Sequence, residues 1–134
     1  MRRAMEHQDR DHVSLCFCSI GGATLAFSSQ HLKAFVGSEA GELAASFDLA
    51  ERLALVHDAA SPPQAAVLWF RGRERVVRLG SSVRLRSVPL LHLHPLPALL
   101  RGLRRTAGLA GVVLEGHAFA LLIDFEALSD SPIV

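Results

Sequence analysis

Two histidines spaced two residues apart, His92 and His94, form the pattern in this sequence that most resembles a metal site. On a β-strand both rings would project from the same face and offer nitrogen ligands to zinc. Zinc needs a third ligand and usually a fourth, and the remaining candidates, His57 and His117, have no spacing that fixes them. A metal-binding protein or metal-dependent hydrolase using His92 and His94 is therefore one hypothesis. The simpler interpretation is that His92 and His94 lie near a strand end and bind no metal.

The candidate nucleophiles have weaker patterns. Cys16 and Cys18 lie in an apolar run, and their spacing suits two buried thiols better than a disulfide. Ser28 and Ser29 lie near His31, but no Gly-x-Ser-x-Gly elbow accompanies them. The sequence also lacks the glycine patterns of phosphate-binding and dinucleotide-binding loops. We therefore expect no catalytic residue, no metal and no cofactor, and a protein that is not an enzyme.

Arginine is concentrated in one part of the chain. Between residues 71 and 105 there are nine arginines and a single acid, Glu74, whereas the formal charge of the whole chain is +1. A basic part beside an acidic remainder indicates a charged partner surface or a contact between the two parts. The candidates for binding an acidic partner are Arg84 and Arg86 first, followed by Arg73, Arg75 and Arg78.

These arginines also raise the hypothesis of a basic nucleic-acid-binding protein. The chain has no Tyr and one Trp, so aromatic platforms on which bases stack are scarce. Neither a helix-turn-helix nor an RNP pattern is present. We therefore expect a solvated or protein-docking basic face and no nucleic-acid partner.

The elements that would position these residues are mostly strands, which either alternate in polarity or form short apolar runs. The predicted strands are residues 13–20, 23–29, 65–70, 73–79, 82–91, 110–114 and 117–123. Tight turns join three neighbouring pairs, at Gly21-Gly22, Arg71-Gly72 and Glu115-Gly116. The stretch 29–36 fits either a helical turn or a further strand. Strands at this spacing, with few helices, predict a small β-barrel or sandwich.

One predicted strand carries the leading candidates for partner binding. In residues 82–91, Val83 and Leu85 alternate with Arg84 and Arg86. Since successive side chains of a strand point to opposite faces, this alternation predicts one buried face and one basic face.

Helical segments are short. Residues 47–55 predict a helix of about two turns, with Asp48 as its N-cap and Glu51 at the third helical position. Pro97 favours the start of a helical turn, and Asp124 is placed to cap a last turn near the end of the chain.

Length and composition limit the overall class. The 134 residues suffice for one domain, or for two small lobes that share a core. With 50% hydrophobic and 20% charged residues, the chain is not of the disordered class. No apolar run approaches the roughly 20 residues that span a bilayer, and the polar start lacks the apolar stretch of a secretory signal. We expect a soluble, cytoplasmic protein.

The order of several short motifs resembles the CheW-like domain family. FDLAERLAL at 47–55 resembles the family's DLxxRLGL helix, and a strand, a turn at Gly72 and a strand ending in VRLGSSV follow in the family's order. The front of the chain, CFCSIGGATLAFSSQHLKAFV, resembles the family's opening pattern f.vgg..yalp...v.ev. Three further segments resemble later motifs, namely HPLP at 94–97, GLAGVV at 108–113 and LLIDFEAL at 121–128. Together the motifs cover residues 13–128.

One family feature has no counterpart. Members carry a proline-containing stretch and an lGxxnlRGxvxPV strand pair before the DLxxRL helix, where this chain has only residues 37–46, which predict a loop. Arg71-Gly72 follows the helix, in the wrong order. The resemblance implies a mainly β fold of two small SH3-like barrel subdomains, the first abbreviated, with few short helices. The expected bounds are a disordered segment 1–12, a CheW-like domain 13–128 and a tail 129–134.

The resemblance also implies a function. CheW-like domains are adaptors that join chemoreceptors to the regulatory domain of CheA-type histidine kinases. The expected function is therefore non-enzymatic chemosensory scaffolding, with binding to the cytoplasmic domain of a methyl-accepting chemoreceptor, to a CheA-type kinase or to both, and no insertion into a membrane. In its abbreviation the chain is similar to short CheW-like proteins of gliding-motility systems.

Overall fold

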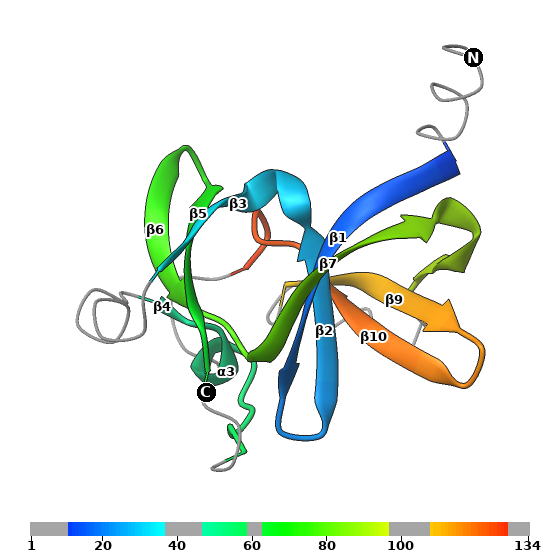
Figure 1. Cartoon of the computed structure of the whole chain (residues 1–134), viewed down its shortest axis with the longest axis horizontal. Coiled ribbons are helices and arrows are strands. Elements are labelled where there is room, and N and C mark those ends of the chain that lie inside the picture. Colours follow the sequence, from blue (N-terminus) through cyan, green and yellow to red (C-terminus); the bar gives the residue numbers. More distant parts are fainter. Residues whose placement is uncertain (1–10, 37–46, 59–62, 97–107, 129–134) are drawn as a thin grey trace.

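The structure, a computed structural model, describes residues 11–36, 47–58, 63–96 and 108–128, which are mostly β-strand (Figure 1). Several expectations lie outside these residues: the loop at 37–46, the helical turn at Pro97, all but the last two residues of the segment 1–12, and the tail 129–134. No helix within the described ranges has the length and hydropathy that crossing a bilayer requires.

The larger sheet has six strands and combines both ends of the described chain. Their order is β7 (Ser81–Pro89), β1 (His12–Ile20), β2 (Ala23–Ser28), β10 (Ala118–Ile123), β9 (Leu109–Glu115) and β8 (Leu93–Pro95). The two edge strands, β7 and β8, are consecutive in the chain and are joined by the 3-10 turn η2 (Leu90–His92). The sheet therefore curls back on itself, as a small barrel does.

The smaller sheet has four strands. Their order is β3 (Leu32–Val36), β5 (Ala65–Phe70), β6 (Arg73–Arg78) and β4 (Phe47–Asp48). The last of these is only two residues long and runs parallel to β6. Within the described residues this lobe is smaller than the five-stranded subdomain that the family resemblance implies, and β4 directly follows the stretch where the deletion was expected. The stretch 29–36 forms both expected alternatives in turn, the 3-10 turn η1 (Ser29–His31) and then β3.

The three predicted tight turns are present, one of them displaced. Ile20 lies opposite Ala23 across Gly21-Gly22, and Phe70 lies opposite Arg73 across Arg71-Gly72. In the last hairpin Glu115 lies opposite Ala118, so the turn is Gly116-His117 and not Glu115-Gly116. Gly116 has a φ of 63°, the left-handed conformation that glycine adopts without strain. The displacement makes Glu115 the last residue of a strand.

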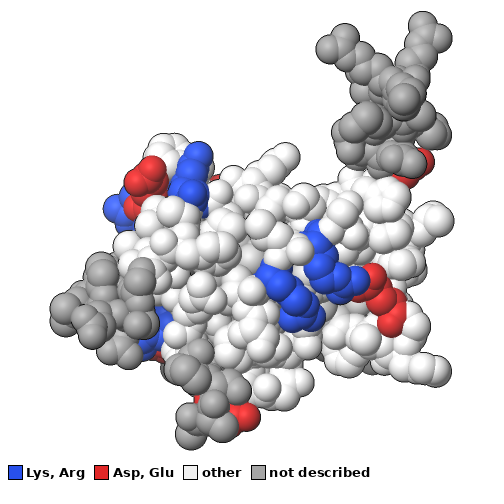
Figure 2. All heavy atoms as spheres, in the orientation of Figure 1, with Lys and Arg blue, Asp and Glu red and all other residues white. Residues whose placement is uncertain are grey.

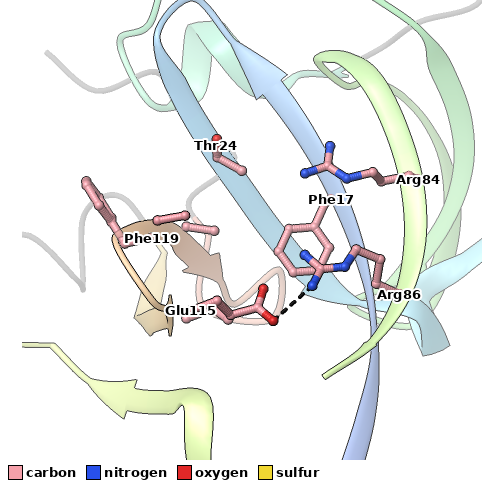
Figure 3. Close-up of a pocket in the computed structure, with 9 residues that line it drawn as sticks. Phe17, Thr24, Arg84, Arg86, Glu115 and Phe119 are labelled. Atoms are coloured by element: carbon pink, nitrogen blue, oxygen red, sulfur yellow. Dashed lines mark hydrogen bonds and ion pairs between the residues drawn. The ribbon is translucent and has the colours of Figure 1, made fainter. Parts of the chain in front are cut away.

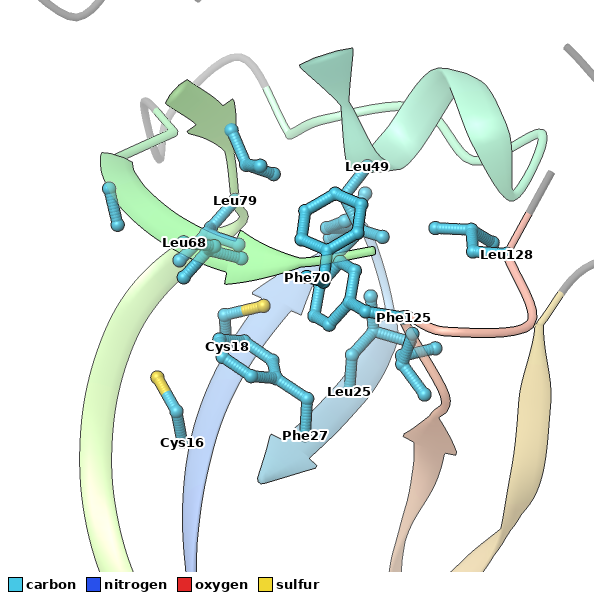
Figure 4. Close-up of a cluster of buried hydrophobic side chains, with 14 of the residues drawn as sticks. Cys16, Cys18, Leu25, Phe27, Leu49, Leu68, Phe70, Leu79, Phe125 and Leu128 are labelled. Carbon is cyan, nitrogen blue, oxygen red and sulfur yellow. The ribbon is translucent and has the colours of Figure 1, made fainter. Parts of the chain in front are cut away.

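A shared core joins the two sheets (Figure 4). The larger sheet contributes Cys16 and Cys18 of β1 together with Phe27 of β2, and the smaller sheet contributes Leu68 and Phe70 of β5. Phe125, which follows β10, packs edge-on against Phe27 with ring centroids 5.0 Å apart, and its centroid is also 5.0 Å from that of Phe70. Cys16 and Cys18 are free and buried, as expected.

A second, smaller core lies within the curled larger sheet, and we call it the barrel core. Its buried members are Leu15, Phe17, Ala26, Val88, Val113 and Ala120. β1 therefore buries both of its faces, one in each core, because odd-numbered residues point into the barrel and even-numbered residues point into the shared core. On the second face Cys16, Cys18 and Ile20 are buried, whereas Ser14 is exposed.

The predicted helix is present but shorter. α3 spans Leu49–Arg52, and the Asp48 side chain accepts a hydrogen bond from the Ala50 amide at 3.0 Å, which confirms the N-cap. Ala54, which follows the C-cap residue Leu53, has a φ of 56°. The Leu55 amide donates to the Ala50 carbonyl at 2.8 Å, so the end has the bonding of a Schellman motif.

Candidate docking site

A β-bulge in β7 decides which way its arginines point. Phe17 of β1 lies opposite Arg84, whereas Ser19, two residues further along β1, lies opposite Ser81, three residues earlier in β7. The additional residue coincides with Ser82, whose φ of 53° is left-handed. An extra residue in one strand reverses the faces of the residues on its two sides.

The bulge turns the basic face of β7 toward the barrel core. Arg84 and Arg86 lie on the face of Phe17, because directly opposed residues of an antiparallel pair project to the same side. Val83, on the other face, packs against the shared core, whereas Leu85 is 53% exposed. The expectation of one buried and one basic face is therefore wrong in part, because the arginines overlie a buried side chain and Leu85 faces solvent.

Both guanidinium groups lie over the same aromatic ring. The Cζ atom of Arg84 is 5.4 Å, and that of Arg86 4.9 Å, from the ring centroid of Phe17. These distances are within the roughly 6 Å over which a cation is attracted to an aromatic face. Phe17 is itself buried. Its ring thus fixes two cations side by side at the entrance to the barrel.

A groove separates this arginine pair from the β9–β10 hairpin (Figure 3). We call it the arginine groove; its boundary includes Phe17, Arg84, Arg86, Val113, Glu115 and Phe119. The two arginines approach from β7, and Glu115 and Phe119 stand on the opposite side, as Figure 3 shows. The cavity volume is about 90 Å³.

The groove opens where two strands of the larger sheet separate. β10 pairs with β2 through only two residue pairs, Leu121 with Leu25 and Leu122 with Ala26. The start of β10 therefore diverges from the start of β2, and the two hairpins point apart in Figure 1. Thr24 of β2 and Ala118 of β10 line the opening.

Glu115 neutralises one of the two arginines. Its Oε2 atom is 2.9 Å from Arg86 Nη2 and 3.5 Å from His92 Nδ1. The hydrogen bond from Arg86 is the main reason that the pKa of Glu115 lies below its ordinary value, and His92 acts in the same direction. The contact spans β7 and β9, which are not neighbours in the sheet, and so it also closes the barrel across its interior.

Arg84 keeps most of its hydrogen-bonding capacity. Its Nη1 donates to the Ser82 carbonyl at 3.2 Å, which leaves the other N–H donors of an arginine side chain available. Among the described residues, no acidic side chain forms an ion pair with Arg84. The exposed face in Figure 2 carries neighbouring basic side chains with an acidic one beside them, surrounded by uncharged atoms. Arg84 is thus a cation held in place and open to a partner.

The remaining predicted arginines lie elsewhere, on β6 of the smaller sheet. Arg78 forms an ion pair with Asp48 at 3.5 Å, and the Cζ atom of Arg75 is 4.8 Å from the centroid of Phe70. Arg73 is exposed at the start of the strand. The structure therefore divides the five candidate arginines between two sheets, and only Arg84 and Arg86 lie together over one groove.

The candidate metal ligands are not assembled into a site. His92 lies in the turn η2 and His94 in β8, so the two do not share one strand as expected. His92 contacts Glu115, whereas His57 is 3.6 Å from Asp48. Within the described ranges, no group of three or more His, Cys, Asp or Glu side chains is placed to hold a metal ion.

The candidate nucleophiles have structural contacts. Ser28 accepts a hydrogen bond from the Gln30 amide and caps η1. His31 Nδ1 donates to the Trp69 carbonyl at 2.8 Å, and its ring packs against Phe125. Burial raises the pKa of Cys16 to about 12, with a smaller contribution from Cys18, so its reactive thiolate form is suppressed at neutral pH.

The acidic and the two aromatic residues of the groove, Glu115, Phe17 and Phe119, are absent from the sequence-based candidates. Phe17 is indistinguishable in sequence from any strand phenylalanine, and Phe119 likewise. Glu115 precedes Gly116, and the sequence therefore predicts it as a turn residue. A signal for Glu115 does exist, because a Gly-His pair can form the two-residue turn and leave the glutamate at the strand end.

Comparison with known proteins yields a match in structure only. No protein-family model matches the sequence, and no curated protein does so either. The crystal structure of the scaffolding protein CheW from Thermoanaerobacter tengcongensis superposes with a TM-score of 0.66, covering 89% of this chain and 93% of that one. The chain has the CheW-like fold. Since the two sequences are 12% identical, the likeness is one of architecture. The CheW-like fold confirms the fold class expected from the order of the motifs.

Proposed function

We propose that this protein is a non-enzymatic chemosensory adaptor, which acts in the cytoplasm by docking the cytoplasmic domain of a chemoreceptor, a CheA-type histidine kinase or both. The single observation that carries the proposal is the CheW-like fold, since the matched protein is itself a scaffolding protein. The order of motifs across residues 13–128 points to the same family.

The chemistry of the described residues supports docking. Ser28 caps a turn, His31 bonds a backbone carbonyl, and Cys16 and Cys18 lie in the shared core. What remains exposed is a charged surface with scattered apolar side chains, of which Phe119, Leu85 and Trp69 are examples. Protein interfaces commonly combine apolar contacts with a charged rim that sets encounter rate and specificity.

Arg84 and Arg86 are the first candidates for contact with an acidic partner surface. They are adjacent, exposed and fixed over Phe17, so that little side-chain entropy is lost when they bind. Arg73 is a second candidate because it is exposed. Arg75 and Arg78 rank lower, since each has a contact within the smaller lobe.

Binding to immobilised partners tests this proposal. The chain should be retained by the cytoplasmic domain of a chemoreceptor, by a CheA-type kinase or by both, and the double reversal Arg84→Glu with Arg86→Glu should lower retention at least tenfold, because attraction becomes repulsion. Lys33→Glu, at an exposed cation of β3 in the smaller sheet that is not among the candidates, is the control and should retain the partner. Failure to bind either partner would contradict the proposal, and unchanged binding of the double variant would reject this choice of face.

A further inference from the structure

The charges at the arginine groove are unequal in number. Arg84 and Arg86 contribute two positive charges, and Glu115, paired with Arg86, contributes one negative charge. One positive charge therefore remains uncompensated, and it belongs to Arg84, which has only the Ser82 carbonyl as a hydrogen-bond partner among the described residues. The groove is matched to a ligand with one negative charge.

A carboxylate fits this balance better than a phosphate. A phosphate group carries about −1.5 to −2 charges at neutral pH, more than the groove offers, and Glu115 would repel it. A planar carboxylate accepts two parallel N–H bonds from a guanidinium such as that of Arg84. Glu115 shows that a carboxylate binds at this place, because it accepts one hydrogen bond from the neighbouring Arg86 at 2.9 Å.

The size of the groove limits the occupant further. Its volume of about 90 Å³ is well below the roughly 300 Å³ of small-molecule pockets. It suits the end of a single side chain. The carboxylate is thus best supplied by an aspartate or glutamate side chain of a larger molecule that lies across the surface.

An exposed apolar pair lies next to the groove on the β9–β10 hairpin. Phe119 is 61% exposed and Leu114 is 43% exposed, and the two lie directly opposite each other in the hairpin. Because successive residues of a strand alternate in face, this pair projects to the side of the hairpin opposite to Glu115 and Val113, and of the two only Phe119 also lines the groove. A segment that leaves the groove at this rim therefore passes over Phe119.

We propose that the arginine groove binds an extended acidic and apolar segment of the docking partner. Arg84 receives a carboxylate of the segment, an apolar side chain of the segment packs on Phe119 at the rim, and Glu115 competes with the segment for Arg86. The segment lies where β2 and β10 separate, because the start of β10 has no ladder partner on that side. This inference rests on the proposed docking function and specifies the chemistry of the partner.

A labelled peptide tests the inference on the full chain. The probe is a ten-residue peptide of alternating glutamate and leucine, and the control peptide has glutamine in place of glutamate. Fluorescence anisotropy should show binding of the acidic peptide only, weakening as salt is raised. Arg84→Ala should lower the affinity about tenfold, since one charge-assisted bidentate contact is lost. Lys33→Ala, which removes an exposed cation of β3 in the smaller sheet, should leave the affinity unchanged.

A second variant should change the affinity for the acidic peptide in the opposite direction. Glu115→Gln removes the resident carboxylate and releases Arg86, so the affinity for the acidic peptide should rise about threefold, by analogy with the energy of exposed ion pairs. If Glu115 had a purely structural role, Glu115→Gln would bind the acidic peptide more weakly or not at all. Phe119→Ser should weaken binding of the acidic peptide without changing its dependence on salt.

The outcomes separate this inference from the proposed function. Equal binding of the two peptides, equal loss in the Arg84 and Lys33 variants, or weaker binding by Glu115→Gln would overturn the groove assignment. If the Arg84 variant still binds the kinase or receptor domain like the wild type, the assignment also fails while the adaptor function stands. If the acidic peptide binds as described but neither partner domain does, the groove assignment stands and the adaptor proposal fails.

Discussion

Glu115 connects the stability of the barrel to the charge of the groove. It joins β9 to β7 through Arg86, and His92 approaches the same carboxylate oxygen. From the sequence alone Glu115 is placed in the turn, because it precedes Gly116, and the true turn is one residue later. The arginines of β7 are identified from composition, but their direction depends on the bulge at Ser82, which no residue pattern in 82–91 reveals.

The Arg86–Glu115 pair predicts a specific pH dependence of stability. The folded-state pKa of Glu115 is lowered, so the pair stabilises the fold above the ordinary glutamate pKa of about 4.3 and this stabilisation is lost as the pH falls through the lowered value. Both side chains are partly exposed, so the effect is at most about 1 kcal/mol. In urea unfolding, Glu115→Gln should be less stable than the wild type at pH 7, and the difference should shrink toward pH 3.

The same substitution at another glutamate is the control for this experiment. Glu74 is exposed on β6, and Glu74→Gln should leave the free energy of unfolding nearly unchanged at both pH values. A Glu115→Gln difference that stays constant from pH 7 to pH 3 would contradict an electrostatic origin.

At the scale of elements, the sequence predicts the hairpins best and the start of β7 least well. The turns at Gly21-Gly22 and Arg71-Gly72 follow from local chain chemistry, and both are present. β7 begins where its backbone approaches β1 so closely that a Cβ atom on Gly80 would overlap the Ser19 carbonyl oxygen. Such a contact depends on tertiary structure and leaves no periodic pattern in the sequence.

The residue after α3 departs from the family pattern. Ala54 has a left-handed φ at the position where the pattern DLxxRLGL has glycine.

The close approach at Gly80 predicts a large effect of a small substitution. Gly80→Ala places a methyl group against the Ser19 carbonyl and the Ile20 side chain, and the backbone must shift at the junction of the two sheets. The Gly80 carbonyl also accepts a hydrogen bond from the Gln64 amide at 3.1 Å, which the shift would disturb. We expect a loss of about 2 kcal/mol in the free energy of unfolding, measured by chemical denaturation.

Gly22 offers the matched comparison, because a Cβ atom there meets no other atom within 4 Å. Gly22→Ala should therefore change the stability much less than Gly80→Ala. Equal effects of the two substitutions would show that Gly80 does not approach the Ser19 carbonyl as closely as described.

At the scale of the whole molecule, two sheets depend on each other for burial. β1 belongs to the larger sheet, yet its even-numbered residues fill the core shared with the smaller one. The turn of β5 and β6 is also tied to the end of the chain, because the Arg71 amide donates to the Glu126 carboxylate at 3.1 Å. The fold class followed from the order of motifs along the sequence. The division of β1 between two cores did not, since the expected burial of Cys16 and Cys18 does not tell which sheet they pack against.

The adaptor hypothesis is tested most directly by mapping where a partner binds. Amide chemical shifts of the full chain, labelled with nitrogen-15, should be recorded as a CheA-type kinase regulatory domain is added, and separately a chemoreceptor cytoplasmic domain. The account predicts that at least one of them shifts the amides of Thr24, Glu115 and Phe119 together with those of β7. Shifts confined to the smaller sheet, or none with either domain, would contradict it.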